Sequence, residues 1–264
     1  MNDQTLNSLQ VEVNPRRIGA ACRMAIGKAK LILLLSFAVA LTTAGSCNSP
    51  TLFQSNFDAT AIGQPPSTTQ AVGTASIDGP TGSVLVAAAP PNAQPSGKWL
   101  QINVANNSGQ VASFQGKLTQ QPGNGTYVFS TALFIPPAGP QGQDNVATIS
   151  FEALAAQGNL PAEFLHLDFI ANNRVQIDDD GSTVFGQFPR NQVFLVQVTL
   201  DINATSAKAH IILSGAGASG EADRNVVSPL VGQAQRFGAV RVRMGFPHTG
   251  TFFATNVLVQ RKQQ

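Results

Sequence analysis

The sequence has few cysteines, few charges and few Glu or Lys residues. Its two cysteines, Cys22 and Cys47, both lie in the first fifth of the chain, which excludes a disulfide framework or a cysteine-based metal site in the rest. Charged residues make up 11% of the 264 residues, about half the usual share. With 24 Gly and 16 Pro and no long run of helical period, a helical bundle is excluded as well.

The net charge of +2 comes from the first part of the chain. Five basic and two acidic residues precede position 31, whereas 11 basic and 12 acidic residues follow from Cys47 onward. The body of the protein is therefore close to neutral. It carries no basic patch of the size that nucleic-acid binding requires, so no nucleic-acid partner is expected.

An apolar run, Leu31–Leu41 (LILLLSFAVAL), follows a basic flank and leads into the small residues Thr42–Ser46. A transmembrane helix needs about 20 apolar residues, whereas the apolar region of a signal peptide needs about 7–15. The run has 11 residues, which fits a signal peptide. A transmembrane anchor is the less favoured alternative.

Ala44-Gly45-Ser46-Cys47 resembles the lipobox of bacterial lipoproteins, although Leu is more common where Ala44 stands. The resemblance implies cleavage before Cys47, a diacylglyceryl group on its sulfur, and in many cases a third acyl chain. Two or more chains anchor a protein stably to a membrane. Asn48, in place of Asp, favours the outer membrane if the cell is Gram-negative. The alternative is an ordinary cleaved signal peptide with an incidental cysteine.

These features predict a signal peptide over residues 1–46, a lipidated tether over 47–51 and one domain over 52–262. Residues 1–23 are predicted to be an extension from a misplaced start, because Met24 begins a compact signal peptide by itself.

Residues 52–262 consist of short apolar or alternating runs separated by Gly, Pro and Asn turns. Runs such as 126–135, 192–202 and 207–215 are typical of strands, and in 192–202 Phe194, Val196 and Val198 alternate with more polar residues. About a dozen such runs predict an all-β, two-sheet antiparallel β-sandwich. GAGASG (215–220) is predicted to be a flexible turn.

Three stretches resemble strands of the concanavalin A-like (laminin G-like) jelly roll: LFQSNFD, FPRNQVFLVQVTLDI and GTFFATNVLV. The last departs from the usual closing strand, since Thr255-Asn256 replaces an Asp pair. The resemblance implies a jelly roll over most of residues 52–260 and by itself implies no function.

No catalytic or metal-ligating set emerges from the sequence. Glycoside hydrolysis needs two carboxyl groups near one bond, and strand alternation separates Glu163 from His166 and Asp168. The Asp178–Gly181 stretch (DDDG) lacks the later acid of a calcium loop and is predicted to be a turn. We therefore expect no catalytic residue, no cofactor and no metal.

The candidate ligand-binding residues are His166 and Asp168 on one strand, and Arg241 and Arg243 on another. The single Trp and single Tyr supply a poor stacking platform for sugars. The leading hypothesis is a lipid-anchored, non-enzymatic binding module for a glycan or an envelope protein. A divergent glycan hydrolase using His166 and Asp168, or a purely structural envelope protein, are the alternatives.

Overall fold

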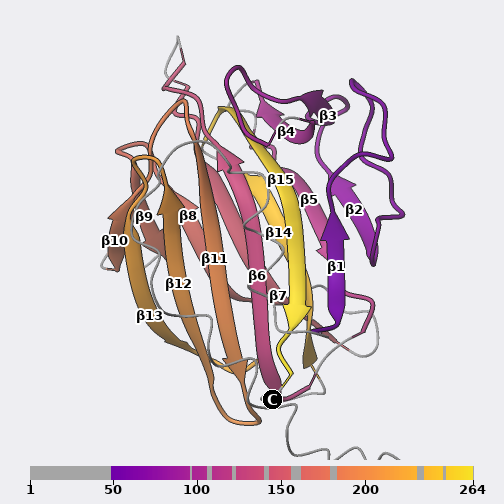
Figure 1. The fold of residues 1–264 in the computed structure, drawn as a ribbon, viewed down its shortest axis with the longest axis vertical. Helices are drawn as coiled ribbons and strands as arrows, with labels where there is room; N and C mark the ends of the chain where they lie inside the picture. The colour runs from indigo at the N-terminus through magenta and orange to yellow at the C-terminus, as the bar shows by residue number, and fades with distance from the viewer. Residues whose placement is uncertain are drawn as a thin grey trace, which may run out of the picture. The chain divides into compact units, whose positions relative to one another are not determined.

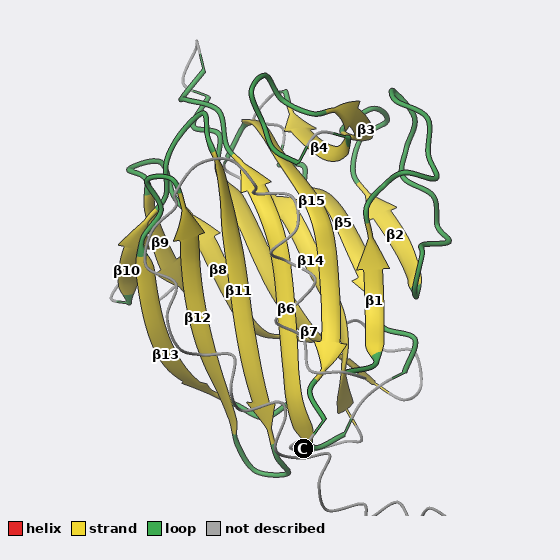
Figure 2. Cartoon of the chain, viewed as in Figure 1, coloured by secondary structure: helices red, strands yellow, loops and turns green. Residues whose placement is uncertain are grey.

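The computed structural model describes residues 49–263, except for 96, 106–108, 121–122, 140–142, 156–161, 179–182, 231–234 and 246–247. Cys47 and the predicted signal peptide lie outside the described residues. The described part is built from strands and loops, and contains no helix long and apolar enough to cross a membrane (Figure 2).

Two antiparallel sheets form the molecule (Figure 1). Among the described residues, sheet A has eight strands. Seven follow in the order β13 (Gly220–Val226), β12 (Ala207–Gly215), β11 (Val193–Ile202), β6 (Gly125–Phe134), β15 (Gly250–Arg261), β4 (Lys98–Val104) and β3 (Val84–Ala88), and β1 (Thr51–Ser55) pairs with β15. Sheet B has the order β10 (Val184–Gln187), β9 (Arg174–Ile177), β8 (Ala162–Phe169), β7 (Ala147–Ala155), β14 (Gln235–Met244), β5 (Ala112–Lys117) and β2 (Thr74–Asp78).

The predicted all-β, two-sheet antiparallel sandwich is confirmed. The chain crosses repeatedly between the sheets, since β4 and β6 lie in sheet A while β5 and β7 lie in sheet B. These crossings give the sandwich the jelly-roll character that the sequence resemblance implied.

The core lies between the two sheets and is rich in aromatic rings. Phe129 of β6 and Phe151 of β7 meet across the sheets with ring centroids 5.2 Å apart, in the edge-to-face arrangement that aromatic pairs prefer. On β11 the inward residues Phe194, Val196 and Val198 are fully buried, as the alternation predicted. Each sheet therefore has one apolar face in the core and one face directed outward.

Two described strands were not predicted. The sequences of β2 (TASID) and β13 (GEADRNV) carry too few apolar residues to be recognised by pattern. The predicted flexible turn at 215–220 is correspondingly shorter, because Ser219 bridges to Gln187 and Gly220 begins β13.

Candidate functional site

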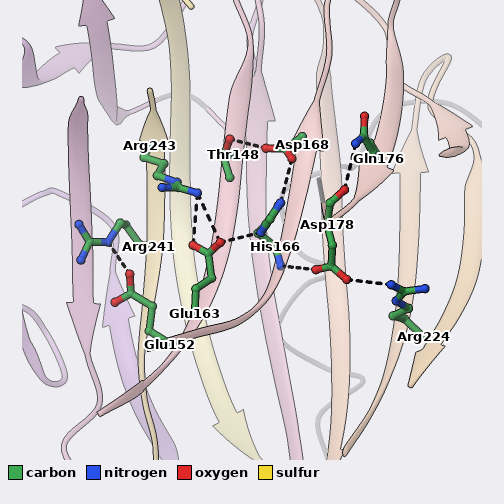
Figure 3. A network of polar contacts seen from close by, with 10 residues as sticks. All are labelled: Thr148, Glu152, Glu163, His166, Asp168, Gln176, Asp178, Arg224, Arg241 and Arg243. Carbon is green, nitrogen blue, oxygen red and sulfur yellow. Dashed lines mark hydrogen bonds and ion pairs between the residues drawn. The ribbon is translucent and has the colours of Figure 1, made fainter. Parts of the chain in front are cut away.

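The outer face of sheet B carries a connected set of polar side chains (Figure 3). Its strands place apolar residues inward, so that Val240, Val242 and Met244 of β14 are buried in the core. Arg241 and Arg243 of the same strand point outward, as predicted. Alternation along each strand thus places the polar groups of β14, β7 and β8 next to one another.

A β-bulge in β8 changes the predicted arrangement of the acids. Phe151 pairs with Leu165 but Glu152 pairs with Glu163, so Phe164 is an extra residue in the ladder. The bulge turns Phe164 toward the core, where its ring lies 5.8 Å from that of Phe237. The prediction that Glu163 points away from His166 and Asp168 is therefore wrong, since it assumed unbroken alternation.

His166 is held between two carboxylates. Its Nδ1 lies 2.6 Å from Oε1 of Glu163, and its Nε2 lies 3.2 Å from Oδ2 of Asp168. Thr148 of β7 donates a hydrogen bond of 2.6 Å to Asp168 Oδ1, and Arg243 lies 3.3 Å from Glu163 Oε2. The structure thus links three of the four predicted binding residues. His166 contacts Asp168 directly, and it is connected to Arg243 through Glu163.

The neighbours of His166 fix its protonation state. Burial by itself would lower the pKa of His166, but the contacts with Asp168 and Glu163 outweigh burial and raise that pKa to about 10. Burial would raise the pKa values of both carboxyl groups, yet the contact with His166 and the charge of Arg243 lower them. At neutral pH the cluster therefore consists of an imidazolium between two carboxylates.

Arg241, the fourth predicted binding residue, belongs to a separate ion pair on the same face. Its Nε donates to Glu152 Oε1 at 2.5 Å, and one of its NH groups donates to Ser113 Oγ at 3.2 Å. Gln115 also donates to Glu152, whose residue exposure is only 4%. Arg241 is thus largely committed to neutralising a buried carboxylate.

A second connection leads from His166 to the edge of sheet A. Asp178, just after β9, accepts a hydrogen bond from the His166 backbone N–H at 3.2 Å, and its other oxygen lies 3.2 Å from Arg224 of β13. A cavity of about 530 Å³ lies beside this connection. Its lining includes Phe164, Leu165 and Val226 as apolar wall, and Glu163, His166, Asp178 and Arg224 as polar groups.

The charges of this region balance within the described residues. Four acids face four cations when His166 is protonated: Glu152, Glu163, Asp168 and Asp178 against His166, Arg224, Arg241 and Arg243. Four of these eight residues were not expected from the sequence: Glu152, Glu163, Asp178 and Arg224. Glu163 was predicted on the wrong face because the bulge in β8 was not foreseen. Arg224 lies on β13, a strand that the apolar pattern of the sequence did not reveal.

The other two histidines lie elsewhere. His210 on the outer face of sheet A lies 2.8 Å from Asp223, and His248 lies 2.5 Å from Asp144 in the loops. No group of three or more His, Cys, Asp or Glu among the described residues is arranged to hold a metal ion.

No protein-family model and no curated protein matches the chain. Among solved structures, it is similar to lectin UEA-II complexed with galactose, at 10% identity over 76% of this chain and 97% of the lectin, with a TM-score of 0.46. Arcelin-5, a lectin-like defense protein from Phaseolus vulgaris, matches at 9% identity over 75% and 96%, with a TM-score of 0.45. A Trypanosoma rangeli sialidase matches at 15% identity over 81% of this chain and 30% of its own, with a TM-score of 0.42. At these identities and TM-scores the matches assign no function.

Proposed function

We propose that this protein is a lipid-anchored cell-envelope protein whose sandwich binds a neutral, hydroxyl-rich ligand of the glycan class and releases it unchanged. The observation that carries the proposal is the cavity of about 530 Å³ that meets the balanced ionic network at His166. A cavity of this size with an apolar wall and a few polar groups is typical of small-molecule sites.

The balance of charge favours an uncharged ligand. The ion pairs leave no net charge to attract a phosphate, sulfate or carboxylate. Paired carboxylates and guanidinium groups still offer acceptors and donors to hydroxyl groups. Sugar hydroxyls, which donate and accept, match such a surface.

Binding is favoured over hydrolysis by the protonation states. A glycosidase needs a carboxylic acid with a raised pKa to protonate the leaving oxygen. Here the pKa values of Glu163 and Asp168 are lowered, and His166 holds its proton with a pKa of about 10. At neutral pH the cluster therefore offers no carboxylic acid to protonate a leaving oxygen, and its two carboxylates are bound to His166.

The aromatic residues limit how a sugar is held. Trp99 and Tyr127 are fully buried and cannot stack on a ligand. The partly buried Phe164 is the aromatic residue among those that line the cavity. We expect hydrogen bonds rather than ring stacking to supply most of the affinity.

The anchor is proposed from the sequence. Cys47 ends the segment that resembles a lipobox, and β1 begins four residues later at Thr51. Acylation of Cys47 would hold the sandwich next to a membrane, and Asn48 favours the outer membrane if the cell is Gram-negative. An envelope location would also give the site access to extracellular or cell-wall glycans.

A glycan array probed with the detergent-purified full-length product tests the ligand class, followed by calorimetry with the best oligosaccharide. Arg224→Gln should raise Kd at least about tenfold, since a charged hydrogen-bonding group at the cavity contributes about 1.5–3 kcal/mol. Arg174→Gln, an exposed change on β9 outside the lining, is the matched control and should leave Kd unchanged. Binding only of anionic glycans, or an unchanged Kd for Arg224→Gln, would contradict the proposal.

A further inference from the structure

Exposed basic residues gather at the end of the sandwich where the chain enters it. We name Lys117, Arg236, Arg261 and Lys262 the basic end; all four are exposed. Lys117 ends β5, Arg236 is in β14, and Arg261 and Lys262 lie where β15 leads into the C-terminal segment. In Figure 1 the start of β1 and the C-terminus lie at this same end.

Several contacts place these residues around the entry point. The Arg261 backbone N–H donates to the carbonyl of Pro50 at 3.0 Å, and the Arg261 guanidinium donates to the carbonyl of Asn124 at 2.9 Å. Gly123, beside Asn124, lies next to the Arg236 guanidinium. Lys117 ends β5, where the next two residues bond to the backbone of Gly238 and Leu52.

Most of the positive charge at the basic end is not paired with other groups of the described part of the chain. Within the described residues, the side chains of Lys117, Arg236 and Lys262 make no hydrogen bond or ion pair. Asp201 is an exposed acid at this end, where Thr126 donates to it at 2.6 Å.

The tether places this surface close to a membrane, if Cys47 is acylated as proposed above. Two residues separate Cys47 from Pro50, and the three steps between them place their Cα atoms at most about 11 Å apart. The Debye length in physiological salt is about 8 Å, so the basic side chains interact with the lipid surface once the tether lets them approach within about that distance.

We infer that the basic end is a docking surface for anionic lipid headgroups. This inference rests on the proposed anchor, and it adds a defined orientation of the sandwich on the membrane. Each Lys or Arg near an anionic surface contributes about 1 kcal/mol, so the four together hold the domain against the bilayer. The strands then run toward and away from the membrane, because β1 begins and β15 ends at the basic end.

Lysine footprinting on vesicles tests this surface. The full-length gene product, purified from envelopes in detergent, is reconstituted into vesicles of phosphatidylcholine alone or mixed with phosphatidylglycerol. Amine-reactive labelling read by mass spectrometry then compares Lys117 and Lys262 with the reference lysine Lys98 of β4. We expect Lys117 and Lys262 to lose reactivity only with phosphatidylglycerol, and to regain it in about 1 M salt, where the Debye length is about 3 Å.

Two variants and one mass measurement complete the test. Arg236→Gln should lower the ratio of seated to free domain about fivefold, while the matched Arg174→Gln on β9 should not change it. Equal reactivity in both vesicle types, or equal effects of the two variants, would overturn the docking surface. The intact mass of the purified protein reports acylation separately, and an unacylated product would refute the anchor. In that case, lysine footprinting of the unanchored protein with added vesicles would still test whether the basic end binds anionic lipids.

Discussion

Raising the pH from about 6.5 to about 10 should weaken the folded protein, because His166 loses its proton over this range. The pKa of His166 is raised in the folded state relative to the unfolded chain. Its contribution to stability is therefore complete below the unfolded pKa of about 6.5 and is lost as the pH rises through the folded pKa of about 10.

The magnitude follows from the shift and from the exposure of the three partners. Each pKa unit corresponds to about 1.36 kcal/mol, which sets an upper bound of about 5 kcal/mol. The His166 side chain is 11% exposed, but those of Glu163 and Asp168 are 28% and 19% exposed, so solvent screens the interaction. After that discount we expect a loss of about 2 kcal/mol in the free energy of unfolding.

Urea unfolding followed by the fluorescence of the buried Trp99 measures this loss across the pH range. The His166→Gln variant keeps every other titrating group, so the difference between the two proteins isolates His166. The difference should be about 2 kcal/mol at pH about 6.5 and should vanish above pH about 10. A difference that does not depend on pH would refute the protonated, carboxylate-bound state of His166.

Three further changes test the packing around the two sheets. Gly116→Ala should cost about 1–3 kcal/mol of unfolding free energy, because the added methyl would overlap the Phe53 ring, whereas Gly245→Ala has room and should change it little. Arg190→Lys should cost about 3 kcal/mol, because Arg190 donates to the side-chain oxygen of Asn173 and to backbone carbonyls that include those of Ala171 and Asp144; urea titration against Arg174→Lys checks this. Glu152→Ala should cost about 3–5 kcal/mol of unfolding free energy, because it removes the carboxylate that Arg241 is paired with. The Tm of this variant should fall far more than the Tm of Asp223→Ala, since Asp223 and its partner Lys208 are both exposed. Equal shifts in Tm would contradict a buried ion pair between Glu152 and Arg241.

The sequence predicts the fold well where strands carry their own apolar pattern. Val193–Ile202 alternates cleanly, and its inward residues are those buried in the core. By contrast, β13 is stabilised by what it pairs with. Its backbone bonds to β12, and Asp223 lies 2.8 Å from Lys208, which no pattern within GEADRNV could reveal.

The candidate site was predictable only in part. Strand alternation correctly directed Arg241 and Arg243 outward, because β14 is regular over that stretch. The same rule failed for Glu163, since one bulged residue reverses the side to which every earlier side chain points. Asp178 and Arg224 meet only because the edges of the two sheets approach each other, which depends on the whole fold.

The central claim is that the cavity at His166 binds a neutral glycan without cleaving it. Equilibrium dialysis of the full-length product with the best neutral oligosaccharide, followed by a reducing-end assay, tests both halves at once. We predict saturable binding of one oligosaccharide per chain, a weaker Kd in Arg224→Gln but not in Arg174→Gln, and full recovery of intact sugar. New reducing ends, or binding that does not saturate, would contradict the account.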